Sequence, residues 1–528
     1  MCRVHRYALA LFAGLGLWLA FPSHDLWPLA PVGVALLALA TRGAGPARGA
    51  VVGLVAGLAC FLPLLSWSGI YVGAVPWVAL SVLEALYVAL LGAASGLLQS
   101  PRTLTGRAPV RPVVVALLWV AQEALRSATP FGGFPWGRLA FSQADSPLLH
   151  LAALAGAPAV TFGTALAGGL LAVAVARLRW EGPGRGIPVS GWLGALPALA
   201  GAVALTLAPA LVPTPVDGPR APVMAVQGNV PRAGLEFNAE RRRVLDNHAT
   251  VTHAAAASVH AGAKEHPDLV VWPENSSDID PLRNGDAAAV INAAVDDIAA
   301  PVVVGAVLEE PSPRISNASL LYRPGVGVTQ RYVKQHPVPF AEYIPYRSFF
   351  RHLNDKVDLV RSDMAPGPAP AVFRVPSRTA GTLAAGPVIC FEVAYDGLVR
   401  ETVAHGANLL LVQTNNATFG YTDESEQQLA ISRVRAVEHG RSVVHVSTVG
   451  VSALITPDGV AHQRTTLFTA ALLSGALPVR SGLTLADRVG AWPELLACAV
   501  VVLLLIARGR HGLRRYSRGD RTTSEGRT

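Results

Sequence analysis

Long apolar stretches separated by short polar segments make up the N-terminal part of the chain. Seven of them approach or exceed the length that a helix needs to cross a hydrocarbon core of roughly 30 Å. They are Tyr7–Ala20, Leu26–Ala40, Ala50–Leu65, Val75–Leu98, Val113–Leu125, Pro147–Val175 and Trp192–Leu211. Another stretch, Trp492–Ala507, lies near the C-terminus. The pattern predicts a multi-pass α-helical membrane domain over 1–212, a C-terminal transmembrane helix over 490–508, and a basic, disordered tail over 509–528.

The segment between 220 and 480 has a different pattern. Short β-type runs alternate with stretches of helical periodicity, which predicts an α/β domain with a sheet covered by helices. Strands are expected at 223–227, 269–272, 302–307, 317–322, 330–333, 388–390, 408–413 and 442–448, and helices at 239–262, 286–299, 398–405 and 425–439. The stretch 335–371 has little periodicity and many prolines and aromatics, which is typical of a functional loop or a lid.

The arginines predict the orientation of the chain in the membrane. They cluster in alternate loops, at 3 and 6, at 42 and 48, at 102, 107 and 111, and at 177, 179 and 185. Cytoplasmic loops are enriched in Lys and Arg, so the N-terminus is expected inside the cell. Seven crossings then leave the 220–480 domain outside the cytoplasm. No small-residue cleavage site follows the first apolar run, so we expect an uncleaved first span rather than a signal peptide.

Composition supports a membrane protein and argues against several other classes. The chain is 51% hydrophobic and only 15% charged, with a mean hydropathy of +0.40. Its net charge of +8 comes from arginines at the ends of apolar runs and in the C-terminal tail, so nucleic-acid binding is not expected. The four cysteines have no paired spacing, which predicts neither a disulfide framework nor a zinc site.

Three segments of the α/β region end a predicted strand with a reactive side chain. Glu274 follows Leu-Val-Val-Trp-Pro at 269–273, Lys334 follows the strand at 330–333, and Cys390 ends the strand at 388–390. Because Trp272 precedes Glu274, we expect a partly desolvated carboxylate with a raised pKa, which is a better base near neutral pH. Each residue alone has an ordinary alternative: a capping or surface glutamate, a solvated lysine, or a buried structural cysteine.

Together, Glu274, Lys334 and Cys390 resemble the Glu-Lys-Cys triad of the nitrilase (carbon–nitrogen hydrolase) superfamily. With the membrane spans, the chain resembles the apolipoprotein N-acyltransferases within that superfamily, over nearly its whole length. The motifs are Gly-Phe-Pro-Trp at 133–136, Val-Gln-Gly-Asn-Val-Pro at 226–231, Trp-Pro-Glu at 272–274, Lys334 with Pro-Phe-Ala-Glu at 339–342, Cys-Phe-Glu at 390–392 and Asn-Asn-Ala-Thr-Phe at 415–419. The resemblance implies an αββα sandwich for the 220–480 domain.

The resemblance and the chemistry of thiols imply a role for each residue of the triad. Only the thiolate of a cysteine is a competent nucleophile, so Cys390 needs a base and a cation nearby. Glu274 would accept its proton, and Lys334 would stabilise the thiolate and then the oxyanion.

Other positions of the family's motifs are expected to support the reaction or to bind substrate. Glu342 and Glu392 match further acidic positions and are assigned supporting roles, with turn-capping as the alternative. Phe391 is also a supporting position, where many family members carry Tyr. Residues expected at an apolar entrance for acyl chains are Phe237, where many members carry Trp nearby, and the loop residues Tyr343 and Tyr346. Packing within a lid is the alternative for these aromatics.

The resemblance also implies the substrates. The acyl donor would be a phospholipid and the acceptor the N-terminal diacylglyceryl-cysteine of a lipoprotein, in the cell membrane of a bacterium. No cofactor, metal or nucleic acid is expected, and nothing in the sequence requires more than a monomer. The alternatives are a membrane-tethered nitrilase-type amidase, in which water resolves the acyl-enzyme, and a transporter or sensor. The spans contain few ionisable residues, Glu84 and Glu123 among them, which disfavours a transport pathway.

Overall fold

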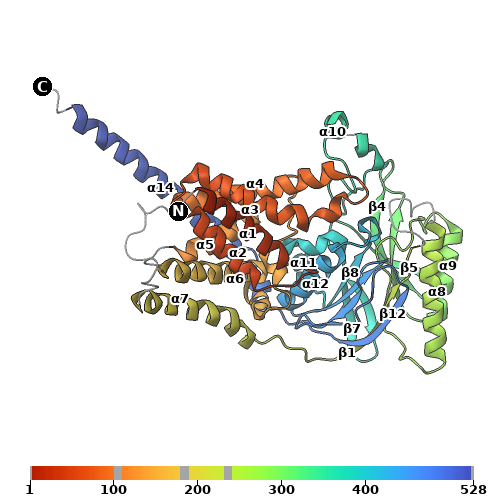
Figure 1. Cartoon of the computed structure of the whole chain (residues 1–528). Helices are drawn as coiled ribbons and strands as arrows, with labels where there is room; N and C mark the ends of the chain where they lie inside the picture. The colour runs from red at the N-terminus through yellow and green to blue at the C-terminus, as the bar shows by residue number, and fades with distance from the viewer. Residues whose placement is uncertain (1–2, 100–109, 179–188, 231–240, 354, 525–528) are drawn as a thin grey trace.

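A helical bundle and an α/β domain lie side by side in the computed structural model (Figure 1). The structure describes residues 3–99, 110–178, 189–230, 241–353 and 355–524. The bundle helices are α1 (Arg3–Leu19), α2 (Leu29–Thr41), α3 (Pro46–Leu64), α4 (Ala74–Leu98), α5 (Pro112–Arg126), α6 (Ala152–Arg177), α7 (Val189–Leu207) and the C-terminal α14 (Trp492–Ser524). Each of them falls on an apolar stretch that the sequence singles out.

The described helices include five that are long and apolar enough to cross a membrane. These spans are Pro46–Leu64, Ala74–Leu98, Pro147–Arg177, Ser190–Leu211 and Trp492–Arg510, and α1 and α2 are shorter apolar helices. Small residues allow α3 and α4 to approach closely, because a Cβ added at Gly49 would lie 2.2 Å from the carbonyl oxygen of Gly92. Close backbone packing of this kind is typical of helices in lipid, where apolar burial drives association only weakly.

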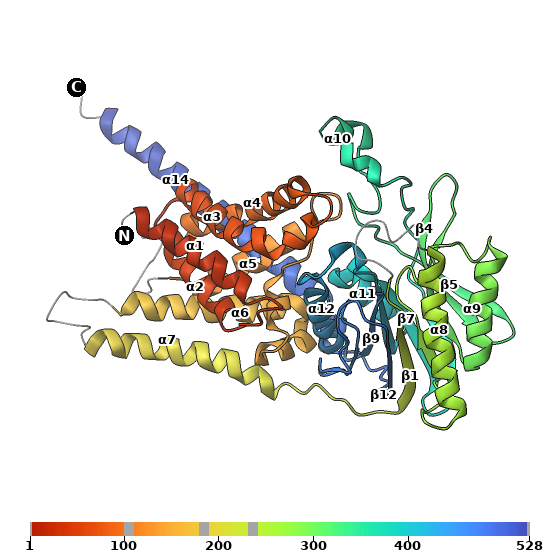
Figure 2. The ribbon, with the colours of Figure 1, turned by 45° about the vertical axis from the view of Figure 1, so that its right-hand side comes forward.

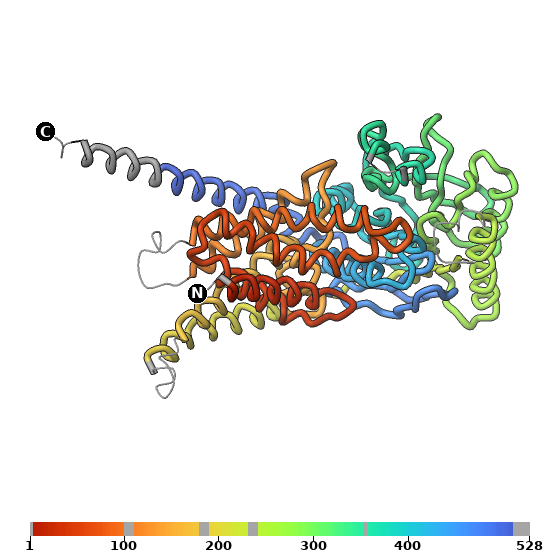
Figure 3. Tube along the Cα trace, turned by 45° about the horizontal axis from the view of Figure 1, so that its top comes forward, coloured from red at the N-terminus to blue at the C-terminus, as the bar shows by residue number. Residues whose placement is uncertain are grey.

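The C-terminal segment differs from the sequence-based expectation. We expected a disordered tail over 509–528, but α14 continues as a helix to Ser524. Propagation adds one backbone hydrogen bond per residue, and no proline interrupts the segment after residue 507, where arginines favour helix and Gly509, Gly512 and Gly519 disfavour it. Near its start, α14 packs against α5 and α4, and from there it leads away from the α/β domain (Figure 3).

The α/β domain contains two six-stranded sheets packed face to face. The first sheet consists of β1 (Arg220–Gln227), β2 (Leu269–Val271), β3 (Val302–Leu308), β4 (Ser316–Arg323), β5 (Gly327–Val333) and β12 (Ala471–Pro478). The second consists of β6 (Phe373–Ser377), β7 (Gly381–Ile389), β8 (Leu409–Thr414), β9 (Ser442–Ser447), β10 (Ala453–Ile455) and β11 (Ala461–His462). Their orders are β12-β1-β2-β3-β4-β5 and β11-β10-β9-β8-β7-β6. Val223 and Leu269 of the first sheet meet Phe373 and Leu409 of the second in a buried core.

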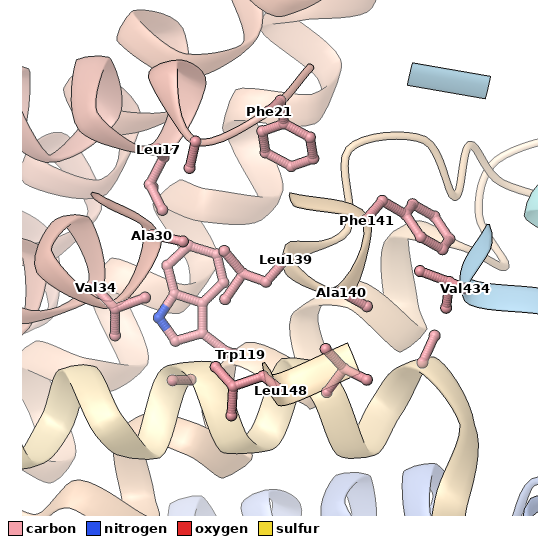
Figure 4. Close-up of a cluster of buried hydrophobic side chains, with 14 of the residues drawn as sticks. Leu17, Phe21, Ala30, Val34, Trp119, Leu139, Ala140, Phe141, Leu148 and Val434 are labelled. Atoms are coloured by element: carbon pink, nitrogen blue, oxygen red, sulfur yellow. The ribbon is translucent and has the colours of Figure 1, made fainter. Parts of the chain in front are cut away.

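Helices cover the outer face of each sheet, which completes the αββα sandwich (Figure 2). On the first sheet lie α8 (Arg241–His260) and α9 (Gly285–Ile298), and on the second lie α11 (Asp396–Ala404) and α12 (Glu424–His439). The second pair of helices is also covered by the bundle. One buried cluster runs from Trp119 and Phe141 of the bundle to Val434 of α12 (Figure 4). The α/β domain is therefore joined to the bundle by a continuous apolar core.

Four strands of the domain have no counterpart among the strands expected from the sequence. They are β6, β10, β11 and β12. The strand β12, with its small residues Ser474, Gly475 and Ala476, lies at the edge of the first sheet, where it pairs antiparallel with β1. Such strands have weak local preferences and form because a distant partner is available. In the irregular stretch 335–371, the structure adds the short helix α10 (Arg347–Leu353), and α13 (Leu485–Val489) precedes α14.

A buried arginine links the bundle to the α/β domain. Arg138, between α5 and α6, forms ion pairs with Glu123 of α5 at 3.4 Å, Asp396 of α11 at 2.7 Å and Glu494 of α14 at 2.9 Å. Arg435 of α12 also pairs with Asp396 and donates a hydrogen bond to the carbonyl oxygen of Val393 at 2.8 Å. Charges removed from water are stable only when they are paired. The two parts of the chain are therefore joined by charge as well as by apolar packing.

We predict that Arg138→Leu lowers the free energy of unfolding by about 3–5 kcal/mol, because it leaves buried carboxylates without their cation. Thermal and chemical unfolding of the purified chain in detergent measures this effect. The matched control is Arg242→Leu, which removes an exposed pair with Asp246 within α8 and should change stability little. Equal stability of the two variants would contradict the role given to Arg138.

Candidate active site

The residues Glu274, Lys334 and Cys390 lie at strand ends in the two facing sheets. Glu274 follows β2, and Lys334 directly follows β5 of the same sheet. Cys390 follows β7 of the other sheet and begins the 3₁₀ turn Cys390–Ala394. The structure thus brings together three side chains that the sequence separates by more than fifty residues each. The site forms where the two sheets face each other.

The backbone at Cys390 turns sharply between the strand and the 3₁₀ helix. Its φ is 53°, in the left-handed region that L-residues with a side chain rarely adopt. Such strained residues persist only where surrounding contacts hold them, and they cluster at functional sites. The contacts that hold this turn come largely from Glu392, two residues further along.

Glu392 joins the cysteine turn to the lysine strand. Its fully buried carboxylate accepts hydrogen bonds from the backbone N–H groups of Ile389 at 2.8 Å, Gln335 at 2.7 Å and His336 at 3.1 Å. The hydroxyl of Tyr332 in β5 donates to the same carboxylate at 2.9 Å. Burial raises the pKa of Glu392 to about 7, and Lys334 and the backbone donors oppose that rise. Glu392 therefore connects the turn at Cys390 to the segment that carries Lys334.

Lys334 is buried between two carboxylates. Its Nζ lies 2.8 Å from Glu342 Oε1 and 3.3 Å from Glu274 Oε1. Burial alone would lower the pKa of Lys334, but the charges of Glu342 and Glu274 raise it well above its ordinary value. The side chain is therefore a permanent cation. Glu342, expected to support the lysine, also accepts a hydrogen bond from the N–H of Val338 at 2.6 Å.

Glu274 has the environment of a general base. Its side chain is buried, and Oε1 accepts a hydrogen bond from Asn317 Nδ2 at 2.7 Å in addition to the contact with Lys334. Burial raises its pKa, and the neighbouring charge of Glu342 adds to the rise, while Lys334 opposes it. The sequence predicts this direction from the preceding Trp272, which is itself fully buried. A carboxylate with a raised pKa is a better proton acceptor than an exposed one.

The thiol of Cys390 is half-buried and surrounded by polar groups. Burial raises the pKa of the thiol well above its usual range, Glu274 raises it further, and Lys334 lowers it. The resting sulfur is therefore protonated at neutral pH. Thr414 Oγ1 lies 3.4 Å and Gln428 Nε2 3.5 Å from Cys390 Sγ, each in a geometry to donate a hydrogen bond.

Phe391 connects the site to the helical bundle. Its ring stacks on Trp136 at 5.5 Å between centroids and on Phe134 at 5.3 Å. Both rings belong to the Gly-Phe-Pro-Trp segment that the sequence analysis singles out. Phe391 therefore packs the turn at Cys390 against the bundle. This stacking needs an aromatic face and no hydroxyl group.

The aromatic residues expected at an entrance for acyl chains differ from one another in exposure. Tyr343 is half-buried and Tyr346 is exposed, with its ring 6.1 Å from Phe131 of the bundle. Phe237 lies outside the described residues. The substrate-binding role of these aromatics stays a prediction.

Sequence reasoning missed three polar residues that contact the triad: Asn317, Thr414 and Gln428. They lie on β4, β8 and α12. The sequence pattern of these elements predicts that a residue is buried, but not which partner it contacts. The motif Asn-Asn-Ala-Thr-Phe at 415–419 marks the right neighbourhood, because Asn416 Nδ2 donates to Gln428 Oε1 at 3.0 Å. Among the described residues, no group of three or more His, Cys, Asp or Glu side chains is arranged to hold a metal ion.

Two family models match the chain in succession. The model for the apolipoprotein N-acyltransferase N-terminal domain matches residues 13–170, and the carbon-nitrogen hydrolase model matches residues 225–481. An apolipoprotein N-acyltransferase of Mycolicibacterium smegmatis is 41% identical, over 97% of this chain and 87% of the relative. One of Azotobacter vinelandii is 33% identical, over 94% of this chain and 93% of the relative. A solved mutant of the Nesterenkonia AN1 amidase, from the nitrilase superfamily, is 18% identical over 52% of this chain and 94% of its own, with a TM-score of 0.37.

We predict that Glu274→Gln shifts the pH dependence of Cys390 alkylation by iodoacetamide to lower pH. The amide removes a negative charge that raises the pKa of the thiol, while the burial that raises it most remains. Mass spectrometry of the peptide that contains Cys390 measures the rate at each pH. The control is Glu265→Gln, an exposed carboxylate of the same domain, which should leave the profile unchanged. A shift to higher pH in Glu274→Gln would contradict the electrostatic account.

Proposed function

Because this chain belongs to the family of apolipoprotein N-acyltransferases, we propose that it transfers an acyl chain from a phospholipid to the N-terminal amine of a diacylglyceryl-cysteine lipoprotein. This reaction is the last step of lipoprotein maturation. The observation that carries the proposal is a thiol, an ammonium and a carboxylate gathered at facing strand ends, in a domain packed against apolar helices. Both substrates are lipid-anchored, so a membrane-bound site confines the search for them to two dimensions.

In the first half-reaction, Glu274 accepts the proton of the Cys390 thiol and the sulfur attacks the ester carbonyl of the phospholipid. The tetrahedral intermediate carries an oxyanion, which the ammonium of Lys334 stabilises. Its collapse breaks the carbon–oxygen bond of the ester. Glu274 returns the proton to the leaving oxygen, so a lysophospholipid departs and the acyl chain remains on Cys390 as a thioester. The raised pKa of Glu274 suits both proton transfers.

In the second half-reaction, the α-amine of the lipoprotein attacks the thioester carbonyl. The carboxylate of Glu274 removes a proton from the amine, and Lys334 again stabilises the oxyanion. The carbon–sulfur bond breaks, and the sulfur of Cys390 recovers a proton from Glu274. The products are the N-acylated lipoprotein and the enzyme in its starting protonation state. A hydrolase would share the first half-reaction but resolve the thioester with water.

We predict that Cys390→Ala abolishes transfer, because the variant lacks the atom that carries the acyl chain. One assay with phospholipid and a diacylglyceryl lipopeptide should follow two products, the lysophospholipid and the triacylated lipopeptide. Mass spectrometry of the wild-type chain after exposure to phospholipid alone should find the acyl group on Cys390. The matched control is Cys498→Ala, which replaces a half-buried cysteine of α14 and should keep full activity. An acyl group on another residue, or fatty acid release without acylated lipopeptide, would count against the proposal.

We further propose that the 220–480 domain lies outside the cytoplasm of a bacterial cell, with the basic loops of the bundle inside. The alternation of the arginine clusters and the seven crossings expected from the sequence before the domain support this orientation. A catalytic domain outside the cytoplasm would meet lipoproteins after their export.

A labelling experiment tests the orientation. In a chain whose cysteines are replaced by alanine, Lys264→Cys should react with a membrane-impermeant maleimide on intact cells, because Lys264 is an exposed residue of the α/β domain. Arg48→Cys, at an exposed position in the first turn of α3, should react only after the membrane is permeabilised. The reverse pattern would place the domain in the cytoplasm.

A further inference from the structure

The sulfur of Cys390 receives its hydrogen bonds from residues outside the triad. In the described parts of the chain, the donors to Sγ are Thr414 Oγ1 and Gln428 Nε2. The hydrogen bonds of Lys334 Nζ go to the carboxylates of Glu342 and Glu274. The cation that the sequence analysis assigns to the thiolate is therefore engaged elsewhere in the resting site. Direct contact with the reacting atom falls to a threonine and a glutamine.

The amide of Gln428 can point in only one direction. Its Oε1 accepts hydrogen bonds from Thr414 Oγ1 at 2.7 Å and from Asn416 Nδ2 at 3.0 Å. Rotating the amide by half a turn would place its NH₂ group against those two donors. Asn416 is itself oriented, because its Nδ2 also donates to Glu424 at 2.6 Å and its Oδ1 accepts from Ser447. The network therefore directs Nε2 of Gln428 toward the sulfur.

Thr414 has one hydroxyl proton and two acceptors. In the resting site both acceptors are within hydrogen-bonding distance, Gln428 Oε1 at 2.7 Å and the sulfur at 3.4 Å, and the single proton favours the amide oxygen over the neutral thiol. A thiolate is a stronger acceptor than a neutral amide oxygen, so the hydroxyl proton can rotate to Sγ once the sulfur is charged. Asn416 continues to satisfy Gln428 Oε1 after that rotation. This contact strengthens only in the charged state, which is the condition for accelerating a reaction.

We propose that Gln428 and Thr414 form a donor pair that stabilises the Cys390 thiolate. Lys334 gives two of its three ammonium protons to Glu342 and Glu274, and the third serves the oxyanion. The inference rests on the proposed function, because the thiolate is its nucleophile. Both side chains are fully buried, so no water competes for the sulfur from their side. Other charged groups that act on the thiol are Glu274, Lys334 and Glu424. Burial raises the pKa of Glu424 to about 8, and its charge, like that of Glu274, raises the pKa of the thiol.

The helical bundle holds the donor pair in position. Gln427, the neighbour of Gln428 on α12, accepts hydrogen bonds from the indole N–H groups of Trp136 at 2.7 Å and Trp67 at 3.3 Å. Its amide also donates to the carbonyl oxygen of Leu64 at the end of α3, at 3.3 Å. This turn of α12 is therefore anchored to the bundle on one side and contacts the nucleophile on the other.

The test compares the thiol pKa of Cys390 in variants of the full-length chain in detergent, measured from the pH dependence of alkylation by iodoacetamide. Gln428→Met keeps the volume but removes the donor, and Thr414→Val removes the second donor. The double variant should raise the thiol pKa by about one to two units, which is about a tenfold to hundredfold loss of thiolate at neutral pH. Gln428→Met alone should have a smaller effect, because it also frees the Thr414 hydroxyl to donate to the sulfur.

A control variant and a substitute variant complete the measurement of the thiol pKa. Glu426→Gln, on the same turn of α12 but paired with Arg464 at the surface, should leave the thiol pKa unchanged. If the double variant does not fold, Gln428→Glu keeps the shape and places an acceptor beside the sulfur, so it should raise the thiol pKa. A folded double variant, or Gln428→Glu, with the wild-type thiol pKa would overturn the inference. Alkylation needs no lipid, so a chain that shows the shift but forms no acylated lipopeptide would refute only the proposed function.

Discussion

The geometry of the site depends on one buried carboxylate, that of Glu392. It accepts hydrogen bonds from Ile389 at the end of β7, from Tyr332 in β5 and from the two residues that follow Lys334. Hydrogen bonds to a charged group are each worth about 1.5–3 kcal/mol when buried. These bonds join the strand ends of two separate sheets, and they oppose the strain of the left-handed turn at Cys390. They therefore connect the turn that carries the nucleophile to the strand end that carries the cation.

The site around Lys334 contains more acidic than basic side chains. Glu274, Glu342 and Glu392 surround Lys334, which is the cation in contact with Glu274 and Glu342. Burial disfavours each negative charge, so the pKa values of Glu274 and Glu392 rise, and that of Lys334 rises with the carboxylates around it. The raised pKa makes Glu274 a better proton acceptor than an exposed carboxylate. An acyl transfer needs such a group, because the base must accept a proton and return it in each half-reaction.

The bundle contributes to this site as well as anchoring it. Phe134 and Trp136 stack on Phe391, directly after the nucleophile, and Trp136 also bonds Gln427 of α12. Arg138, two residues further on, binds Asp396 at the start of α11. A single loop of the bundle thus contacts Phe391 beside the nucleophile, α11 and α12. Apolar helices and catalytic domain form one packed unit, in which the position of the thiol depends on the helices.

The sequence by itself determined most of the elements and the strand-end positions of three candidate reactive residues. Apolar periodicity predicted the bundle helices and α14, and alternating patterns predicted an α/β domain with Glu274, Lys334 and Cys390 at strand ends, because both are local properties of the chain. Only the tertiary structure decided which groups meet. Asn317, Thr414 and Gln428 lie in buried elements where a polar residue looks ordinary until its partners are known. Edge strands such as β12 likewise form through a distant partner. Pairings across a fold follow from packing, which local sequence does not encode.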